Sequence, residues 1–120
     1  MTPTTIWKRV VHSRIWLVGA RGRLDHSSVP RLEEVLKQLL ADGVKYFVVD
    51  LSEVNYVNSG GLRVLVSTWR TARKQGGEIH LAGLSSRVQE IFEMVRFHQI
   101  FQTFVTADDA VSAITDAWHD

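Results

Sequence analysis

Short apolar stretches of strand character alternate with amphipathic helical stretches along most of the 120-residue chain. The first two strand-like stretches, residues 6–11 and 15–20, are separated by three polar residues, which is typical of a β-hairpin. Strands that alternate with helices form a largely parallel sheet joined by right-handed crossovers. The pattern therefore predicts an α/β fold, with a mixed, mostly parallel sheet of about five strands opened by the hairpin, and about four helices.

Several local signals predict where these elements begin and end. Gly22 is expected to break the second strand, because glycine weakens the interior of a strand. Residues 46–49 form a continuous apolar run, which is typical of a strand buried on both faces. A helix is expected over about residues 60–75, and Ser86 with Gln89 forms a capping box that opens a later short helix.

The composition excludes several classes of protein. The chain has no cysteine, which excludes disulfides and thiolate chemistry. Its net charge of +1 creates no general attraction to nucleic acid or to an anionic membrane. Residues 1–5 are polar and lack the apolar core of a signal peptide. We expect one cytoplasmic domain, residues 1–120, with no direct nucleic-acid or membrane partner, as a monomer or weak dimer.

The segment that carries most chemical information follows the continuous apolar run. A short loop is expected there, so that Ser59 lies at a helix N-terminus, at the carboxyl end of the sheet. Free N–H groups and the helix dipole stabilise a phosphoryl group at such a position. Gly60 and Gly61 leave room for a kinase, and Arg63 lies one helical turn further on. Ser59 is therefore a candidate phosphorylation site, although the same residues also fit an ordinary helix cap.

The segment reads Asp50-Leu51-Ser52-x-Val54-x-Tyr56-Val57-Asn58-Ser59-x-Gly61-Leu62. This order of residues resembles the signature of STAS domains, and especially of bacterial anti-sigma factor antagonists. That signature is an apolar strand followed by D-L-S-x-V-x-[FY]-[IM]-D-S-[ST]-G-L. The resemblance covers nearly the whole chain, because Gly22-x-Leu24-Asp25 is similar to an earlier turn of the family. Gly76-Gly77 is similar to a glycine pair that precedes the fourth strand.

The resemblance implies a regulatory binding protein and not an enzyme, with no metal or cofactor. It implies that a cognate anti-sigma factor, which is also a serine protein kinase, phosphorylates Ser59. The unmodified form would bind that kinase and free a sigma factor or another target, and a PP2C-type phosphatase would reset the cycle. The expected partner-binding residues are Asp25, Asn58, Ser59, Gly60, Gly61 and Arg63.

Two residues depart from the family pattern. Asn58 stands where the family commonly has Asp, which removes a charge beside an incoming phosphate but keeps a side chain able to cap the helix. Gly60 stands where the family commonly has Ser or Thr, which leaves Ser59 as the single hydroxyl at the site.

Other functions fit parts of the sequence. A phosphorylation-independent STAS subunit of a larger signalling or lipid-transport assembly is the alternative within the family. A hydrolase built from Asp25, His26 and Ser59 lacks the Gly-x-Ser-x-Gly elbow. The histidines show no metal-ligand spacing, so they are expected on the surface or at strand edges; they are His12, His26, His80, His98 and His119.

Overall fold

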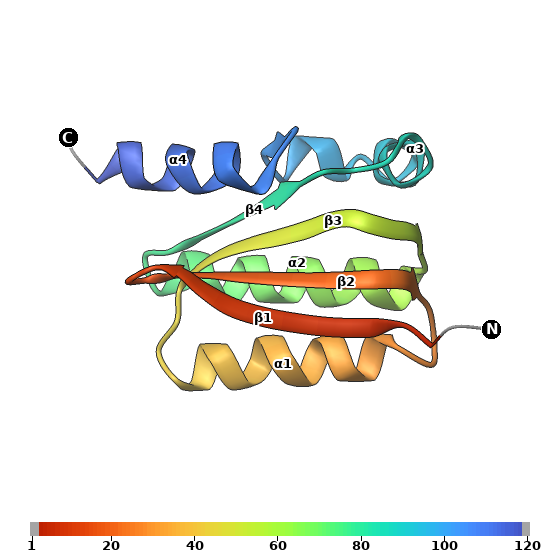
Figure 1. The fold of residues 1–120 in the computed structure, drawn as a ribbon, viewed down its shortest axis with the longest axis horizontal. Coiled ribbons are helices and arrows are strands. Elements are labelled where there is room, and N and C mark those ends of the chain that lie inside the picture. Colours follow the sequence, from red (N-terminus) through yellow and green to blue (C-terminus); the bar gives the residue numbers. More distant parts are fainter. Residues whose placement is uncertain (1–2, 119–120) are drawn as a thin grey trace.

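The elements follow one another in the predicted order, with two strands first and then helices and strands in turn (Figure 1). The structure is a computed structural model that describes residues 3–118, so residues 1 and 2 of the polar N-terminal segment lie outside it. The elements are β1 (Thr5–His12), β2 (Ile15–Leu24), α1 (Val29–Ala41), β3 (Tyr46–Val57), α2 (Ser59–Lys74), β4 (Glu78–Ala82), α3 (Ser86–Met94), the 3₁₀ turn η1 (Phe97–Gln99), β5 (Thr103–Phe104) and α4 (Ala107–Ala117).

The five strands form one sheet in the order β1-β2-β3-β4-β5. β1 pairs with β2 in antiparallel fashion, and every other pair is parallel, which confirms the predicted mixed α/β sheet. Helices α1 and α2 cover one face of the sheet, and α4 lies across the other (Figure 1). The larger core cluster fills the space between the sheet, α1 and α2, and a smaller one lies under α4.

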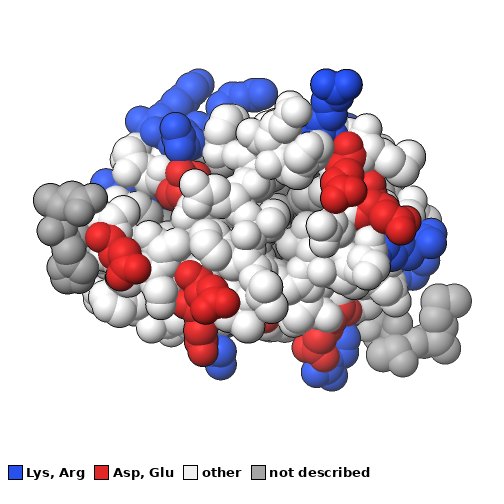
Figure 2. Space-filling view, turned by 90° about the horizontal axis from the view of Figure 1, so that it is seen from above, with Lys and Arg blue, Asp and Glu red and all other residues white. Residues whose placement is uncertain are grey.

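The surface carries charges of both signs. Figure 2, which looks onto the side of α3 and α4, shows Lys, Arg, Asp and Glu interspersed around an uncharged centre, with no large area of one sign. Over the described residues, no helix is both long enough and apolar enough to cross a lipid bilayer.

Strand β3 is longer than the sequence predicted. Residues 50–57, which were expected to form a loop, continue the strand, and Leu51, Val54 and Val57 are buried along it. These apolar residues recur every third position, because the pairing with β2 shifts register at two bulges. A strand that alternates strictly would show a spacing of two, so this stretch lacks the usual pattern. β4 pairs only with residues 46–50, so beyond residue 50 β3 pairs with β2 alone.

Gly22 bends β2 and does not end it, which corrects the expected break. Its φ of +115° lies in the region that favours glycine, and it sits between the two bulges. The Thr4 hydroxyl donates to the Arg23 carbonyl oxygen at 2.7 Å and accepts from the Arg23 N–H at 3.2 Å. β2 therefore continues to Leu24 and reaches the end of β3.

The cap of α3 lies one residue earlier than predicted. The Ser85 hydroxyl accepts from the Val88 N–H at 3.3 Å, and its carbonyl oxygen accepts from the Gln89 N–H at 2.8 Å. The Gln89 side chain donates to Glu93 and takes no part in a capping box. Ser86 is therefore the first helical residue and not the cap.

His80 is buried, whereas the sequence placed it at the surface or at a strand edge. It lies on β4 with 6% of its surface exposed, and its ring centroid is 5.0 Å from that of Phe104. Loss of solvation lowers the pKa of His80, and the nearby Glu78 carboxylate only partly offsets this. His12, His26 and His98 are exposed as predicted, and His119 lies outside the described residues.

The burial of His80 predicts a pH-dependent stability. Because the folded state disfavours the charged ring, below the usual pKa of about 6.5 the unfolded chain binds the proton more strongly than the folded chain. The free energy of unfolding should therefore fall as the pH drops from about 7.5 to about 5.5. In His80→Phe, measured by urea denaturation at both pH values, this fall should be smaller. An equal fall in both proteins would show that His80 does not contribute.

Candidate functional site

The carboxyl ends of β2 and β3 lie side by side, and each leads directly into a helix. Leu24 pairs with Val57, and the Asn58 N–H donates to the Leu24 carbonyl oxygen at 2.9 Å. α1 begins at Val29 and α2 begins at Ser59, so both N-termini lie at this end of the molecule (Figure 1). Parallel pairing thus brings two distant segments of the sequence together, and we call this end the β2–β3 pole.

Asn58 caps α2 with its side chain. Its backbone is extended, with φ −87° and ψ 177°, and its Oδ1 accepts from the Gly61 N–H at 2.9 Å. Its carbonyl oxygen accepts from the Leu62 N–H at 3.1 Å, which starts the helical ladder. Ser59 is the first helical residue and its side chain is exposed, so the structure confirms the predicted position at a helix start. Phosphorylation of Ser59 stays a prediction.

The two glycines after Ser59 differ in what surrounds them. A Cβ on Gly61 would lie 2.9 Å from Val57 Cγ1 and 3.5 Å from Val29 Cγ2, so this buried position has no room for a side chain. A Cβ on Gly60 would lie 3.3 Å from Asn58 Oδ1 and 3.7 Å from Val29 Cγ1. Gly61 therefore lets α2 start close against β3 and α1, behind the surface. Gly60 is half-buried and borders that surface.

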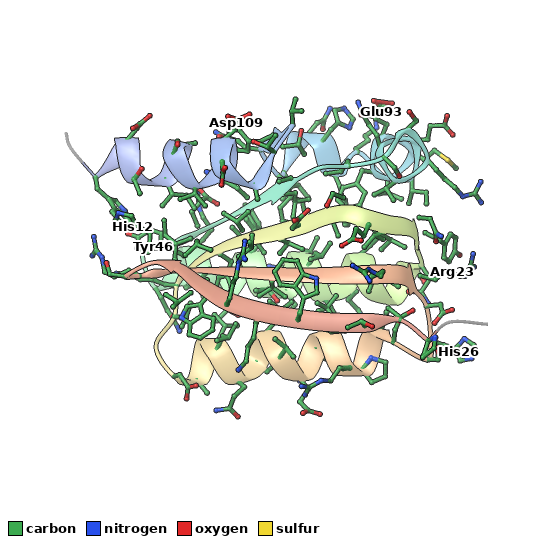
Figure 3. The ribbon with its side chains drawn as sticks, in the orientation of Figure 1. His12, Arg23, His26, Tyr46, Glu93 and Asp109 are labelled. Atoms are coloured by element: carbon green, nitrogen blue, oxygen red, sulfur yellow. The ribbon has the colours of Figure 1, made fainter. Side chains whose placement is uncertain are left out.

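Asp25 places a fixed negative charge at the β2–β3 pole. Its carboxylate accepts from the Ser27 hydroxyl at 2.7 Å and from the Ser27 N–H at 3.1 Å. These hydrogen bonds lower the pKa of Asp25, and the nearby side chains of His26 and Arg23 lower it further. The Arg23 Nε lies 3.7 Å from Asp25 Oδ2 (Arg23 and His26 are labelled in Figure 3). Asp25 is therefore ionised at neutral pH.

Ser28 closes the turn that holds Asp25. This residue is 5% exposed, and its hydroxyl donates to the Arg23 carbonyl oxygen at 2.6 Å. The same hydroxyl accepts from the Asp25 N–H at 3.0 Å. This role of Ser28 cannot be predicted from the sequence, because its hydrogen bonds bridge a bulged strand end and a helix start, and no spacing in the sequence signals such a turn.

Arg63 supplies a positive charge on the exposed side of α2. Its Nη2 lies 3.8 Å from the place where a Cβ on Gly60 would stand, so the guanidinium folds back toward the start of its helix. Within residues 3–118, no carboxylate forms an ion pair with Arg63. Arg23 is engaged differently, because it stacks over Tyr56 at 4.3 Å from the ring centroid. Arg63 thus remains available to an anion near Ser59.

The hydrolase interpretation finds no geometric support. The Asp25 carboxylate is hydrogen-bonded to Ser27, and no hydrogen bond among the described side chains joins His26 to Asp25 or to Ser59. A catalytic triad requires both links. In the described part of the chain, no group of three His, Cys, Asp or Glu residues is placed to hold a metal ion.

The cap at Asn58 gives a testable effect on stability. Asn58→Ala should lower the free energy of unfolding by about 1 kcal/mol, because the Gly61 N–H loses its acceptor. Asn58→Asp keeps an acceptor and adds a negative charge at the positive end of the helix dipole, so it should raise stability at neutral pH by up to about 0.5 kcal/mol. Urea denaturation measures both changes.

Asn55→Ala is the matched control, since Asn55 is exposed on β3. It should change stability by less than about 0.5 kcal/mol. If Asn58→Ala were no more destabilising than this control, the capping bond would not contribute to the start of α2.

The sequence is similar to those of known proteins. The family model of the STAS domain matches residues 7–110. The anti-sigma-B factor antagonist of Staphylococcus aureus is 35% identical over 81 residues, which cover 68% of this chain and 75% of that protein.

Solved structures show the same fold. The crystal structure of an anti-sigma factor antagonist from Mycobacterium paratuberculosis matches with a TM-score of 0.84 and 25% identity, over 94% of this chain and 95% of that one. The Bacillus cell fate determinant SpoIIAA in the phosphorylated form matches with a TM-score of 0.75, over 92% of this chain and 99% of that one. Because the two sequences are only 14% identical, the match with SpoIIAA shows that the fold is shared and nothing more.

Proposed function

This chain belongs to the STAS domain family, and from that premise we propose that it is an anti-sigma factor antagonist controlled by phosphorylation of Ser59. The observation that carries the proposal is the exposed Ser59 side chain at the capped N-terminus of α2. The Staphylococcus aureus relative, named an anti-sigma-B factor antagonist, supports the regulatory role. The protein then acts by binding and not by catalysis.

The proposed partner of the unmodified protein is an anti-sigma factor that is also a serine protein kinase. The contact surface lies at the β2–β3 pole, where Asp25, Asn58, Ser59, Gly60 and Arg63 are fully or partly exposed. Gly61 supports this surface from behind. A kinase must reach the Ser59 hydroxyl, and the lack of a side chain on Gly60 leaves that approach open. Because kinases and sigma factors act in the cytoplasm, we propose that this protein is cytoplasmic as well.

Phosphorylation changes the electrostatics of this surface. A phosphoryl group on Ser59 brings about −1.5 to −2 charges to a position that is neutral in the free protein. The first-turn N–H groups of α2 and the guanidinium of Arg63 stabilise this charge within the protein. Charge added to a desolvated contact weakens docking, so the phosphorylated form releases the kinase. A PP2C-type phosphatase then restores the neutral surface.

Substitutions at Ser59 test this switch. Ser59→Asp should weaken binding to the cognate anti-sigma factor at least about tenfold, because it places a permanent charge in the contact. Ser59→Ala should bind like the wild type and resist modification. Isothermal titration calorimetry with the purified anti-sigma factor measures the affinities, and intact-mass and peptide analysis after incubation with ATP locates the phosphate.

Ser67→Asp serves as the control, because Ser67 is exposed two turns further along α2. It adds the same charge to the same helix and should leave binding within about twofold. If Ser59→Asp binds as tightly as the wild type, the switch is wrong. A stable complex that is insensitive to Ser59 would instead indicate a phosphorylation-independent subunit of a larger assembly.

A further inference from the structure

Helix α4 lies on the sheet without a polar link to another element. Among residues 3–118, the hydrogen bonds of α4 all stay within residues 106–118, and no ion pair includes one of its aspartates. By contrast, α2 is tied to β4 by the ion pair of Arg73 with Glu78 at 2.7 Å. The attachment of α4 therefore depends on apolar and aromatic contacts.

The apolar contacts of α4 are small. α1 buries Leu32, Leu36 and Leu39 together with two valines. α4 buries Ala110 and Ile114, and an alanine has a single methyl group to remove from water. Because hydrophobic stabilisation grows with the apolar area that is buried, α4 gains less free energy from docking than α1 does.

The docking of α4 also carries a polar cost. His80 Nδ1 and Trp118 Nε1 are buried, and neither has a hydrogen-bond partner in the described part of the chain. His80 lies on the sheet face that α4 covers, and Trp118 ends α4. A buried polar atom without a partner has lost its bonds to water, and it regains them when the covering element leaves. Both nitrogens therefore favour an undocked α4.

Trp118 holds the C-terminal end of α4 against the hairpin and β3. Its ring packs edge-on against Tyr46 with centroids 5.1 Å apart, and the Arg14 guanidinium lies over its face at 4.1 Å from the centroid. The His12 ring lies 5.6 Å away, and Tyr46 and His12 are labelled below this end of α4 in Figure 3. Aromatic edge contacts and cation–π contacts are both attractive, so this one side chain fastens the helix end. We call it the Trp118 latch.

The sheet separates the packing of α4 from that of the other helices. The larger core cluster joins α1, α2 and α3 to one face of the sheet. The smaller cluster, which includes Leu17, Val48 and Ala82, lies on the other face under α4 (Figure 1). Removal of α4 therefore leaves the larger cluster intact and uncovers an apolar strip on β2, β3 and β4.

We propose that α4 is a releasable cover of the sheet, which the Trp118 latch closes and which opens as a unit while the rest of the chain stays folded. The apolar strip of Leu17, Val48 and Ala82 is accessible in the open form and buried in the closed form. The cover is separate from Ser59 and does not depend on its modification.

Native-state hydrogen exchange of the full chain at low urea concentration measures this opening. After correction for intrinsic rates, the amides of residues 111–115 should exchange at least about tenfold faster than the slowest amides of α2, because they exchange through a smaller opening. Urea should accelerate them less steeply, since release of one helix exposes less surface than complete unfolding. Equal rates with equal urea dependence in the two helices would overturn the proposal.

The same substitution on opposite faces of the sheet provides a matched pair. Ile114 is buried under α4, and Ile79 is buried on the face of α1 and α2. Ile114→Val destabilises the closed form relative to both the open and the unfolded forms, so amides of both helices should exchange about three- to tenfold faster. Ile79→Val weakens a core that the closed and open forms share. It should accelerate the α2 amides by a similar factor and leave those of α4 within about twofold.

A chain that opens only by complete unfolding would behave differently, because both isoleucine variants would then accelerate both helices equally. That result would overturn the proposal.

Trp118→Ala tests the latch. It should accelerate the α4 amides at least about tenfold, whereas Val105→Ala, which truncates an exposed side chain just before α4, should leave them within about twofold. Exchange of the α4 amides at the wild-type rate in Trp118→Ala would show that Trp118 does not close the cover, contrary to the proposal. If Trp118→Ala does not fold, the pair of isoleucine variants decides.

Discussion

The pairing of β2 with β3 beyond the end of β4 determines the rest of the architecture at the candidate site. Past Asp50, β3 has lost β4 as a neighbour and is held by β2 on its other edge. The bond from the Asn58 N–H to the Leu24 carbonyl oxygen continues this pairing to the start of α2. Because the two strands end side by side, the N-termini of α1 and α2 lie at the same end of the molecule. Asp25 and Ser59, which are 34 residues apart in the sequence, therefore belong to one surface.

The surface at this pole combines a rigid frame with a small polar group. Gly61 fits tightly against Val57 and the first residue of α1, and Asn58 holds the first turn of α2 by its side chain. Ser59 itself is exposed. A modification of Ser59 therefore changes the charge of the surface without requiring a change of fold. The amide of Asn58 in place of a carboxylate reduces the repulsion that a phosphoryl group on the next residue would meet.

Much of this organisation can be predicted from the sequence, and the residues show why. The hairpin, the crossovers and the helix start at Ser59 follow from local signals: alternation, amphipathic periodicity, and an Asn-Ser-Gly-Gly run after a buried strand. The place of Asp25 beside that helix start does not follow from such signals. Its inclusion in the site came from the resemblance to STAS domains, and the structure explains it by parallel pairing of strand ends.

Other features depend on contacts between distant segments. The bulges around Gly22 hide the strand character of residues 50–57, because register shifts disturb the alternation of apolar residues. His80 looks like an outward residue of an alternating strand, yet α4 covers that face of the sheet and buries it. The cap at Ser85 differs from the predicted Ser86 because both serines fit the same local pattern. In each case tertiary packing decides between alternatives that are locally equivalent.

The most direct test of the proposed surface is hydrogen–deuterium exchange of the full chain, alone and in complex with its cognate anti-sigma factor. The first-turn amides of Ser59 and Gly60 precede the hydrogen-bonded ladder of α2, so they should exchange quickly in the free protein. We predict that the complex slows exchange in the segments 25–29 and 58–63 and leaves the opposite end, residues 42–46, unchanged. Protection confined to residues 42–46, with residues 58–63 exchanging as in the free protein, would contradict the assignment of Ser59 to the partner surface.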